Sequence, residues 1–434
     1  MGARARRGLA AGTAVGLLIL GLVACGDDDE GTADDSSTTV GDTGGGEPET
    51  LRIGLVYADL SQFAAINPAY DTGDNEAQAL AIADAWQSQG LLPEGVEVEL
   101  VVRSFDPTDD TTKAAVCQQL AEEDEVFAVL AHRTFTVGAE CLAERFQIPT
   151  ISADAAAVSV YDRTSPYLFT VRSDESTTAR NFVAYADEEG QFEDQTIGLF
   201  YDTANIEAVD ALRDELASRG YEIASEIETG GQGVGSDQDQ VAVQRFEADG
   251  VTAVIPMIGG TTLTNFMTFA DEQSYRPAYL DFDFSEHMVD AAVAGRPPAQ
   301  IEGLTATSQN RVGDFTEGGE VSPETQACLD NYEDFAGEAP DTAVPESAEL
   351  NNILGMCSLG EVLLAGLSNA DEITPEGLVA GLENIQGLAT ANWDSISFSA
   401  DDHSGSNTFR PVSIGADCSC YQVEGDYQEF SLTG

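Results

Sequence analysis

The chain has 434 residues and a formal net charge of −59 at pH 7, from 77 acidic and 18 basic residues. A nucleic-acid partner requires a basic face that neutralises phosphates, so this composition argues against nucleic-acid binding. It is typical of an acidic, well-solvated protein surface.

The N-terminal region has the pattern of an export signal. Three arginines within the first seven residues precede the apolar run 9–24, as in a secretory signal peptide. The run ends in Leu22-Val23-Ala24-Cys25, which resembles the bacterial lipobox and implies cleavage before Cys25 and lipidation of its thiol. Residues 25–50 are acidic and poor in apolar side chains, which predicts a flexible tether. We therefore expect a signal peptide at 1–24 and a mature protein that is lipid-anchored on the extracytoplasmic face of the cell membrane.

From residue 51 onward, short apolar runs alternate with segments of helical periodicity. The first series predicts strand 51–57, helix 71–89, strand 96–105, helix 111–123, strand 126–131, helix 136–146 and strand 148–152. After a break near residues 172–175, a second series predicts strand 196–201, helix 207–219, strand 221–227, helix 237–248, strand 252–257, helix 262–272 and strand 277–282. This alternation predicts an α/β fold with two parallel, doubly wound sheets.

The C-terminal region changes character. Helical periodicity predicts helices 323–337, 347–369 and 374–382, followed by short strands 395–398, 411–414 and 420–423.

Polar residues follow two neighbouring strands of the first predicted sheet. Arg133, Thr134 and Phe135 come shortly after strand 126–131, and Ala153 and Asp154 come directly after strand 148–152. Ligands of open parallel sheets bind outside the carboxyl ends of the strands. These two loops are therefore candidate pocket residues, although ordinary connecting loops have the same pattern.

Six cysteines remain besides Cys25, and in an exported chain they predict three disulfides. Cys117 and Cys141 lie on consecutive predicted helices, and so do Cys328 and Cys357, so both pairings are geometrically easy. Cys418 and Cys420 are left over and would close a small ring. The paired CxxC spacing of structural zinc sites is missing, which favours disulfides over a metal site. We expect no metal and no cofactor.

A series of short motifs resembles a known family. In chain order these are Leu60-Ser61, Phe105-Asp106-Pro107, Ile148-Pro149-Thr150-Ile151-Ser152, Tyr167-Leu168-Phe169-Thr170-Val171-Arg172, Tyr201-Asp202 and the segment SISFSADDHSG. Their order and spacing over about residues 51–430 resemble the type I periplasmic binding proteins, in the branched-chain amino-acid-binding (Leu/Ile/Val) family of ABC-transporter substrate-binding lipoproteins.

The resemblance implies a two-lobed architecture. Lobe 1 would comprise residues 51–172 and 309–398, and lobe 2 would comprise residues 173–308 and 399–434. Three crossover strands would join the lobes, which would close on a small ligand.

The resemblance also implies a set of ligand-binding residues. On lobe 1 these are Ser61, Arg133, Thr134, Phe135, Ala153 and Asp154, and on lobe 2 they are Tyr201, Asn205, Ile258, Asp281 and Asp283. In the family, two loops of lobe 1 hold the ligand's carboxylate, and an acidic residue of lobe 2 binds its ammonium group. The second of these loops corresponds to Ala153, Asp154, Ala155 and Ala156, where the family usually has a hydroxyl residue. That departure argues against an ordinary α-amino acid as the ligand. An aromatic residue of the lobe-2 loop is also missing, since Ile206 is near its place.

The function implied is that of a monomeric solute-binding lipoprotein that delivers a small amino-acid-like or carboxylate-bearing ligand to the membrane permease of an ABC importer. An alternative is a ligand sensor of the same fold that signals to a membrane receptor without transport. An enzyme is not expected, because the chain lacks GxSxG, HExxH and any Ser/His/Asp cluster, and its three histidines are far apart in the sequence.

Overall fold

A computed structural model describes residues 49–64, 70–230, 237–284, 288–293, 295–302, 304–415 and 417–432. The predicted signal peptide, the lipidation site Cys25 and the tether up to residue 48 lie outside the described residues.

The first sheet is fully parallel and has the strand order β2-β1-β3-β4-β5. The strands are β1 (Glu49–Ala58), β2 (Val96–Phe105), β3 (Ala128–Ala131), β4 (Thr150–Ser152) and β5 (Leu168–Thr170). Ile53 and Leu55 of β1 belong to the core on one face, whereas Val56 and Ala58 belong to the core on the other face. This side-chain alternation, with both faces covered, explains why the strands read as unbroken apolar runs.

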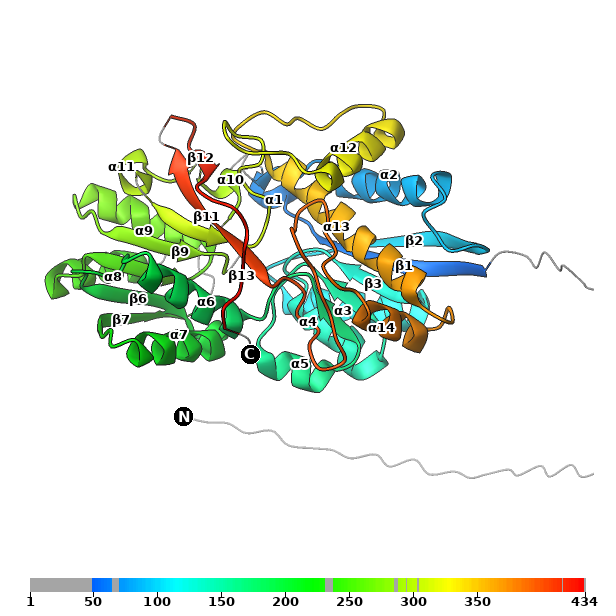
Figure 1. The fold of residues 1–434 in the computed structure, drawn as a ribbon, viewed down its shortest axis with the longest axis horizontal. Coiled ribbons are helices and arrows are strands. Elements are labelled where there is room, and N and C mark those ends of the chain that lie inside the picture. The colour runs from blue at the N-terminus through cyan, green and yellow to red at the C-terminus, as the bar shows by residue number, and fades with distance from the viewer. Residues whose placement is uncertain are drawn as a thin grey trace, which may run out of the picture. The chain divides into compact units, whose positions relative to one another are not determined.

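Helices from two distant parts of the chain cover this sheet, as Figure 1 shows. The first part contributes α1 (Ser61–Ala64), α2 (Asn75–Ser88), α3 (Asp110–Gln118), α4 (Thr136–Glu140) and α5 (Val158–Thr164). The second part contributes α12 (Pro323–Ala336), α13 (Ala348–Asn369) and α14 (Pro375–Glu383). The core on the α2 face combines side chains from both parts. The predicted helix 136–146 is α4 continued by a π-helical turn at Cys141–Arg145.

The second sheet is mixed and has the order β12-β11-β10-β9-β8-β6-β7, with β13 paired to β11. Its parallel strands are β6 (Ile197–Asp202), β7 (Ile223–Thr229), β8 (Ala253–Met257), β9 (Ala278–Phe282) and β10 (Thr305–Ser308). The strands β11 (Thr408–Gly415), β12 (Cys420–Val423) and β13 (Gln428–Glu429) pair antiparallel. The helices of this half are α6 (Glu175–Glu188), α7 (Ile206–Ser218), α8 (Asp237–Asp249), α9 (Gly260–Glu272), α10 (Asp290–Val293) and α11 (Pro298–Ile301). The predicted α/β fold with two parallel-sheet lobes is confirmed.

One predicted strand is wrong. Residues 395–398 form no strand, and Ile396 makes only isolated bridges to Leu388 and Ser406. The segment is apolar because Ile396 and Phe398 pack into the core under α13 and α14, so burial rather than sheet pairing accounts for its sequence pattern.

The helices begin where short polar side chains cap them. The capping residues that accept a hydrogen bond from a backbone N–H of the first turn are Asp74, Asp109, Asp174, Ser322, Ser347 and Thr374. Proline occupies the first helical position after Ser322 and after Thr374, where its missing N–H costs nothing.

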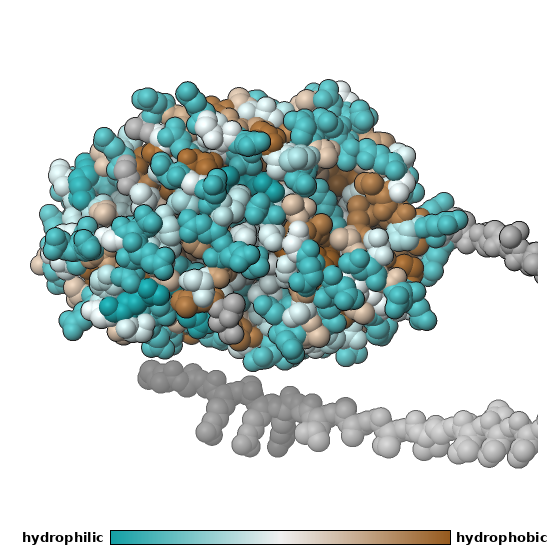
Figure 2. Space-filling view, in the orientation of Figure 1, coloured by the Kyte–Doolittle hydropathy of each residue, from teal (hydrophilic) through white to brown (hydrophobic). Residues whose placement is uncertain are grey.

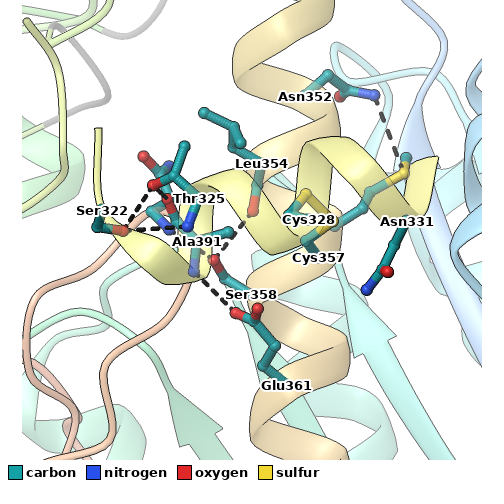
Figure 3. Close-up of a disulfide and its surroundings, with 12 residues drawn as sticks. Ser322, Thr325, Cys328, Asn331, Asn352, Leu354, Cys357, Ser358, Glu361 and Ala391 are labelled. Atoms are coloured by element: carbon teal, nitrogen blue, oxygen red, sulfur yellow. Dashed lines mark hydrogen bonds between the residues drawn. A yellow bond between two sulfur atoms is a disulfide. The ribbon is translucent and has the colours of Figure 1, made fainter. Parts of the chain in front are cut away.

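The three disulfides form with the predicted pairings. Cys117 at the end of α3 is bonded to Cys141 at the end of α4. Cys328 of α12 is bonded to Cys357 of α13, as Figure 3 shows. Both bridges therefore join helices on the first sheet.

Helix α13 is the core helix of the first lobe. Among the described residues, it alone has the length and hydropathy of a membrane span, but 83% of its most apolar window is buried in the protein. The burial accounts for its apolar composition without a membrane. On the face drawn in Figure 2, hydrophilic side chains cover most of the surface, as the acidic composition predicts.

Candidate functional site

Three chain segments cross between the sheets and lie side by side. They follow β5, follow β10 and precede β11. The first and third meet where Thr170 pairs with Ser404, and the second and third meet where Asn310 pairs with Trp393. The Arg311 N–H donates to the Asn392 carbonyl at 3.0 Å. The two lobes are thus joined through a small, hydrogen-bonded junction.

The third crossing segment is fastened to α13, as Figure 3 shows in part. The Ser358 hydroxyl accepts a hydrogen bond from the Asn392 N–H at 2.9 Å, and the Glu361 carboxylate accepts one from the Ala391 N–H at 2.8 Å. The Cys328–Cys357 bridge in turn holds α12 on α13. The position of Asn392 and Trp393 is therefore set by the core helix of the first lobe.

A cavity of about 30 Å³ lies at this junction. Its lining comes from the loops after β3 and β4, from the crossing segments, from the loop after β9 and from α13; the residues are His132, Arg133, Ala153, Arg172, Asp283, Val289, Asn310, Asn351, Gly355, Asn392 and Trp393. Both sheets contribute residues that follow their parallel strands, which is where ligands of α/β sheets bind. The volume matches about two water molecules, so it is the size of a small polar group.

A buried ion pair connects the two halves of this lining. The Arg172 guanidinium donates to the Asp283 carboxylate at 2.5 Å and to the Asp283 carbonyl oxygen at 2.6 Å. Their side chains are 6% and 4% exposed. The other Asp283 carboxylate oxygen accepts a hydrogen bond from the Gln309 N–H at 3.3 Å. The charges of Arg172 and Asp283 therefore cancel within the cavity wall.

The other basic groups of the lining differ in charge. Burial, and then the neighbouring Arg133 guanidinium, holds the pKa of His132 well below its ordinary value, so this imidazole is neutral at pH 7. Arg133 is half-buried, and among the described residues its side chain makes no ion pair. It is the uncompensated positive charge of the described lining.

The loop after β3 holds a carboxylate of the chain itself. The backbone N–H groups of Thr134 and Phe135 donate to the two oxygens of Asp154, at 2.9 and 3.1 Å. Arg133 and Thr134 have φ of 42° and 58°, a left-handed conformation that is uncommon outside glycine. The conformation points successive N–H groups to one side, just ahead of α4, and Asp154 of the next loop fills the place they define.

The structure brings some of the predicted site residues together and leaves others apart. Arg133, Ala153 and Asp283 line the cavity, and Thr134, Phe135 and Asp154 form the loop contact beside it. The predicted residues outside the described lining are Ser61, Tyr201, Asn205, Ile258 and Asp281.

Those five residues have other surroundings. Ser61 is exposed on α1, and Asn205 is the residue before α7. The Tyr201 ring lies under the Arg213 guanidinium, 4.8 Å from its centre. Ile258 is fully buried in the core of the second lobe, and Asp281 is fully buried and accepts a hydrogen bond from the Phe282 N–H. A ligand contact at these positions stays a prediction.

Sequence reasoning missed most of the lining that comes from the crossing segments and α13, namely Arg172, Asn310, Asn351, Gly355, Asn392 and Trp393. A signal existed for some of them, because polar residues such as Arg172 and Asn392 interrupt apolar segments where the chain was expected to cross between the lobes. No periodicity singles out Asn351 and Gly355, which are one helical turn apart on a helix that is apolar nearly all round.

A parallel sheet and a mostly parallel one, three crossing segments and a cavity between the carboxyl ends of the parallel strands define the class of two-lobed α/β binding proteins. A family profile described as Periplasmic binding protein matches residues 50–419, and the chain belongs to this family. The resemblance to the type I periplasmic binding proteins is thus confirmed. No curated protein sequence matches the chain.

Solved structures with the same fold share little sequence with the chain. A possible leucine/isoleucine/valine-binding protein from Rhodopirellula baltica is 18% identical, with a TM-score of 0.66, over 88% of this chain and 98% of that one. A branched-chain amino acid ABC transporter protein from Thermus thermophilus with bound valine is 15% identical, with a TM-score of 0.67, over 88% and 97%. A solute-binding protein from Rhodopseudomonas palustris in complex with p-hydroxybenzoic acid is 13% identical, with a TM-score of 0.66, over 88% and 98%.

Proposed function

We propose that the protein is the solute-binding lipoprotein of an ABC importer, and that it binds a small amino-acid-like or carboxylate-bearing ligand by closure of its two lobes. In this proposal, a lipid on Cys25 holds it as a monomer on the extracytoplasmic face of the cell membrane, where it hands the ligand to the permease. The family and the ligands named for two of the similar structures, valine and p-hydroxybenzoic acid, support the ligand class.

The observation that carries the proposal is the cavity at the junction of the lobes. Both lobes contribute to its lining, so a ligand there touches both. Hinge closure is driven only by contacts that exist in the closed state and are absent from the open one. Residues from the first lobe, such as Arg133, and from the loop after β9, such as Asp283, are placed to make such contacts.

Arg133 is the residue proposed to meet the ligand's negative charge. A guanidinium binds a carboxylate with two parallel hydrogen bonds, and the structure leaves this guanidinium without an ion-pair partner among the described residues. Losing one member of a buried charge pair costs about 3–5 kcal/mol. We therefore expect Arg133→Ala to weaken binding at least about a hundredfold, with little change in fold.

The test begins with a thermal-shift panel of amino acids, amides and organic acids, followed by titration calorimetry of the strongest hit. Arg145→Ala is the matched control, because Arg145 lies at the far end of the helical segment that follows the Arg133 loop and its side chain is 59% exposed. Small-angle scattering with and without the hit measures closure of the lobes. A loss below about threefold for Arg133→Ala would refute the role of Arg133, and an unchanged radius of gyration on saturation would refute binding by closure.

A further inference from the structure

The backbone site that would suit a ligand carboxylate is already filled. The N–H groups of Thr134 and Phe135 each bind one oxygen of Asp154, whose side chain is mostly buried between the loops after β3 and β4. Asp154 is covalently part of the first lobe, so a ligand carboxylate would have to displace a tethered group of the same chemistry. A ligand anion must therefore be received elsewhere at this edge of the sheet.

The cavity beside this loop has the charge that an anion requires. Arg172 and Asp283 neutralise each other at 2.5 Å, and His132 is uncharged. The Asp154 carboxylate beside the cavity is held by the N–H groups of Thr134 and Phe135, so among the described lining residues Arg133 is the charged group without an ion pair. A group with one negative charge compensates it, whereas a zwitterionic group does not.

Four buried polar atoms also lie in this lining without a hydrogen-bond partner among the described residues. They are Nε2 of His132, Nε of Arg172, the side-chain oxygen of Asn351 and Nε1 of Trp393. These residues are 2%, 5%, 3% and 4% exposed. The indole N–H of Trp393 and the guanidinium of Arg133 donate hydrogen bonds and cannot accept them. Buried polar groups in proteins are nearly always paired, so the N–H donors of Arg133, Arg172 and Trp393 mark a place for acceptor oxygens. The Asn351 oxygen can only accept, so it does not contribute to this argument.

We propose that this cavity receives the carboxylate of an organic acid without an α-ammonium group, held by Arg133 and Trp393, and that it discriminates against α-amino acids. The inference rests on the proposed function and narrows its ligand class. The cavity volume of about 30 Å³ suits a carboxylate, and the remainder of the acid requires the lobes to separate further.

The discrimination follows from the charges around the carboxylate. An α-ammonium group is attached to the carbon next to the carboxylate, so it would be placed within several ångströms of the Arg133 guanidinium. Asp283 is the carboxylate of the described lining, and Arg172 and Gln309 engage both of its oxygens. A buried like-charge pair costs several kilocalories per mole, which corresponds to at least about a hundredfold in affinity.

The first test compares acids that differ only in the α-amino group, by titration calorimetry with the purified protein. The matched pairs are 4-methylpentanoate and leucine, 3-phenylpropanoate and phenylalanine, and 3-(4-hydroxyphenyl)propanoate and tyrosine. We expect at least one of the three acids to bind, at least about a hundredfold more tightly than its amino acid. An amino acid that binds within tenfold of its partner overturns the inference but leaves the proposed function standing. A panel in which neither member of any pair binds overturns both.

The second test uses the two tryptophans of the chain. Trp393→Phe keeps an aromatic ring and removes the N–H, and a hydrogen bond to a charged group is worth about ten- to a hundredfold in affinity. The matched control is Trp86→Phe, since Trp86 is buried against Gly360 in the core under α2 and does not line the cavity. We expect Trp393→Phe to weaken acid binding by this factor and Trp86→Phe to leave it unchanged.

The control variant supplies a second readout that does not depend on how well Trp393→Phe folds. The chain has two tryptophans, so the emission of Trp86→Phe comes from Trp393 alone. Titration with the bound acid should change this emission in a saturable way, with the dissociation constant measured by calorimetry. An emission that stays constant through saturation, or equal affinity of folded Trp393→Phe and wild type, overturns the role of Trp393.

Discussion

The ion pair between Arg172 and Asp283 offers the most direct test of how the lobes are held together. Arg172 follows β5 in the first crossing segment, and Asp283 follows β9 of the second sheet. Their side chains are 6% and 4% exposed, and Arg172 also donates to the Asp283 carbonyl oxygen. Arg172→Met keeps the aliphatic length and leaves a buried carboxylate uncompensated. Breaking one partner of such a pair costs about 3–5 kcal/mol.

The loss should arise mostly from the stranded carboxylate and less from the lost hydrogen bonds. We therefore expect the double variant Arg172→Met/Asp283→Asn to recover at least half of the free energy of unfolding that Arg172→Met loses, because the amide carries no charge. Arg145→Met is the control. Its side chain is 59% exposed, and its nearest carboxylate is 3.8 Å away, on Glu122, so it should change stability by less than about 0.5 kcal/mol.

Urea denaturation at pH 7 and 25 °C, followed by circular dichroism, measures all of these variants. A loss below about 1 kcal/mol for Arg172→Met would show that the pair is solvated in solution. A double variant as unstable as the single one would show that an uncompensated Asp283 charge is not the source of the loss.

Three further predictions concern stability. Burial raises the pKa of Asp290 to about 6 and of Glu346 to about 8. The folded state then binds more protons than the unfolded state between about pH 4 and 8, so the free energy of unfolding should fall as the pH rises through this range. A urea midpoint that is higher at pH 8 than at pH 5 would contradict this. Replacing Cys328 and Cys357 by serine opens a bridge with a sequence separation of 29 and should cost about 2–4 kcal/mol. Reduction of the wild type opens the other bridges as well and should cost at least as much. An unchanged urea midpoint of the double serine variant would refute this. Gly138→Ala places a Cβ 2.1 Å from the ring of the fully buried Phe135. This overpacking should lower the free energy of unfolding by about 1–3 kcal/mol. A loss under about 0.5 kcal/mol would show that the ring moves aside freely.

The segment 395–398 and the loop after β3 show where local sequence patterns stop predicting the structure. The strands and most helices follow from periodicity, because burial on both faces of a sheet requires continuous apolar runs. The sequence predicts a strand at residues 395–398, and the structure has none there. The prediction fails because core positions and sheet positions favour the same apolar residues. The loop after β3 is the opposite case. Its left-handed residues Arg133 and Thr134 obey no local preference, and the hydrogen bonds to Asp154 hold them.

The amino-acid sequence by itself determined the α/β fold with two doubly wound sheets, most of its helices and strands, and the two helix-to-helix disulfides. Each depends on residues that are near in sequence or on a period that repeats along the chain. Only the tertiary structure decided which groups share the cavity, because His132, Arg172, Asn351 and Trp393 come from four distant segments. It also decided that Asp154 binds the backbone of its own lobe and that Arg172 neutralises Asp283. Such pairings depend on distances of a few ångströms between segments, and a one-dimensional pattern of polarity does not contain those distances.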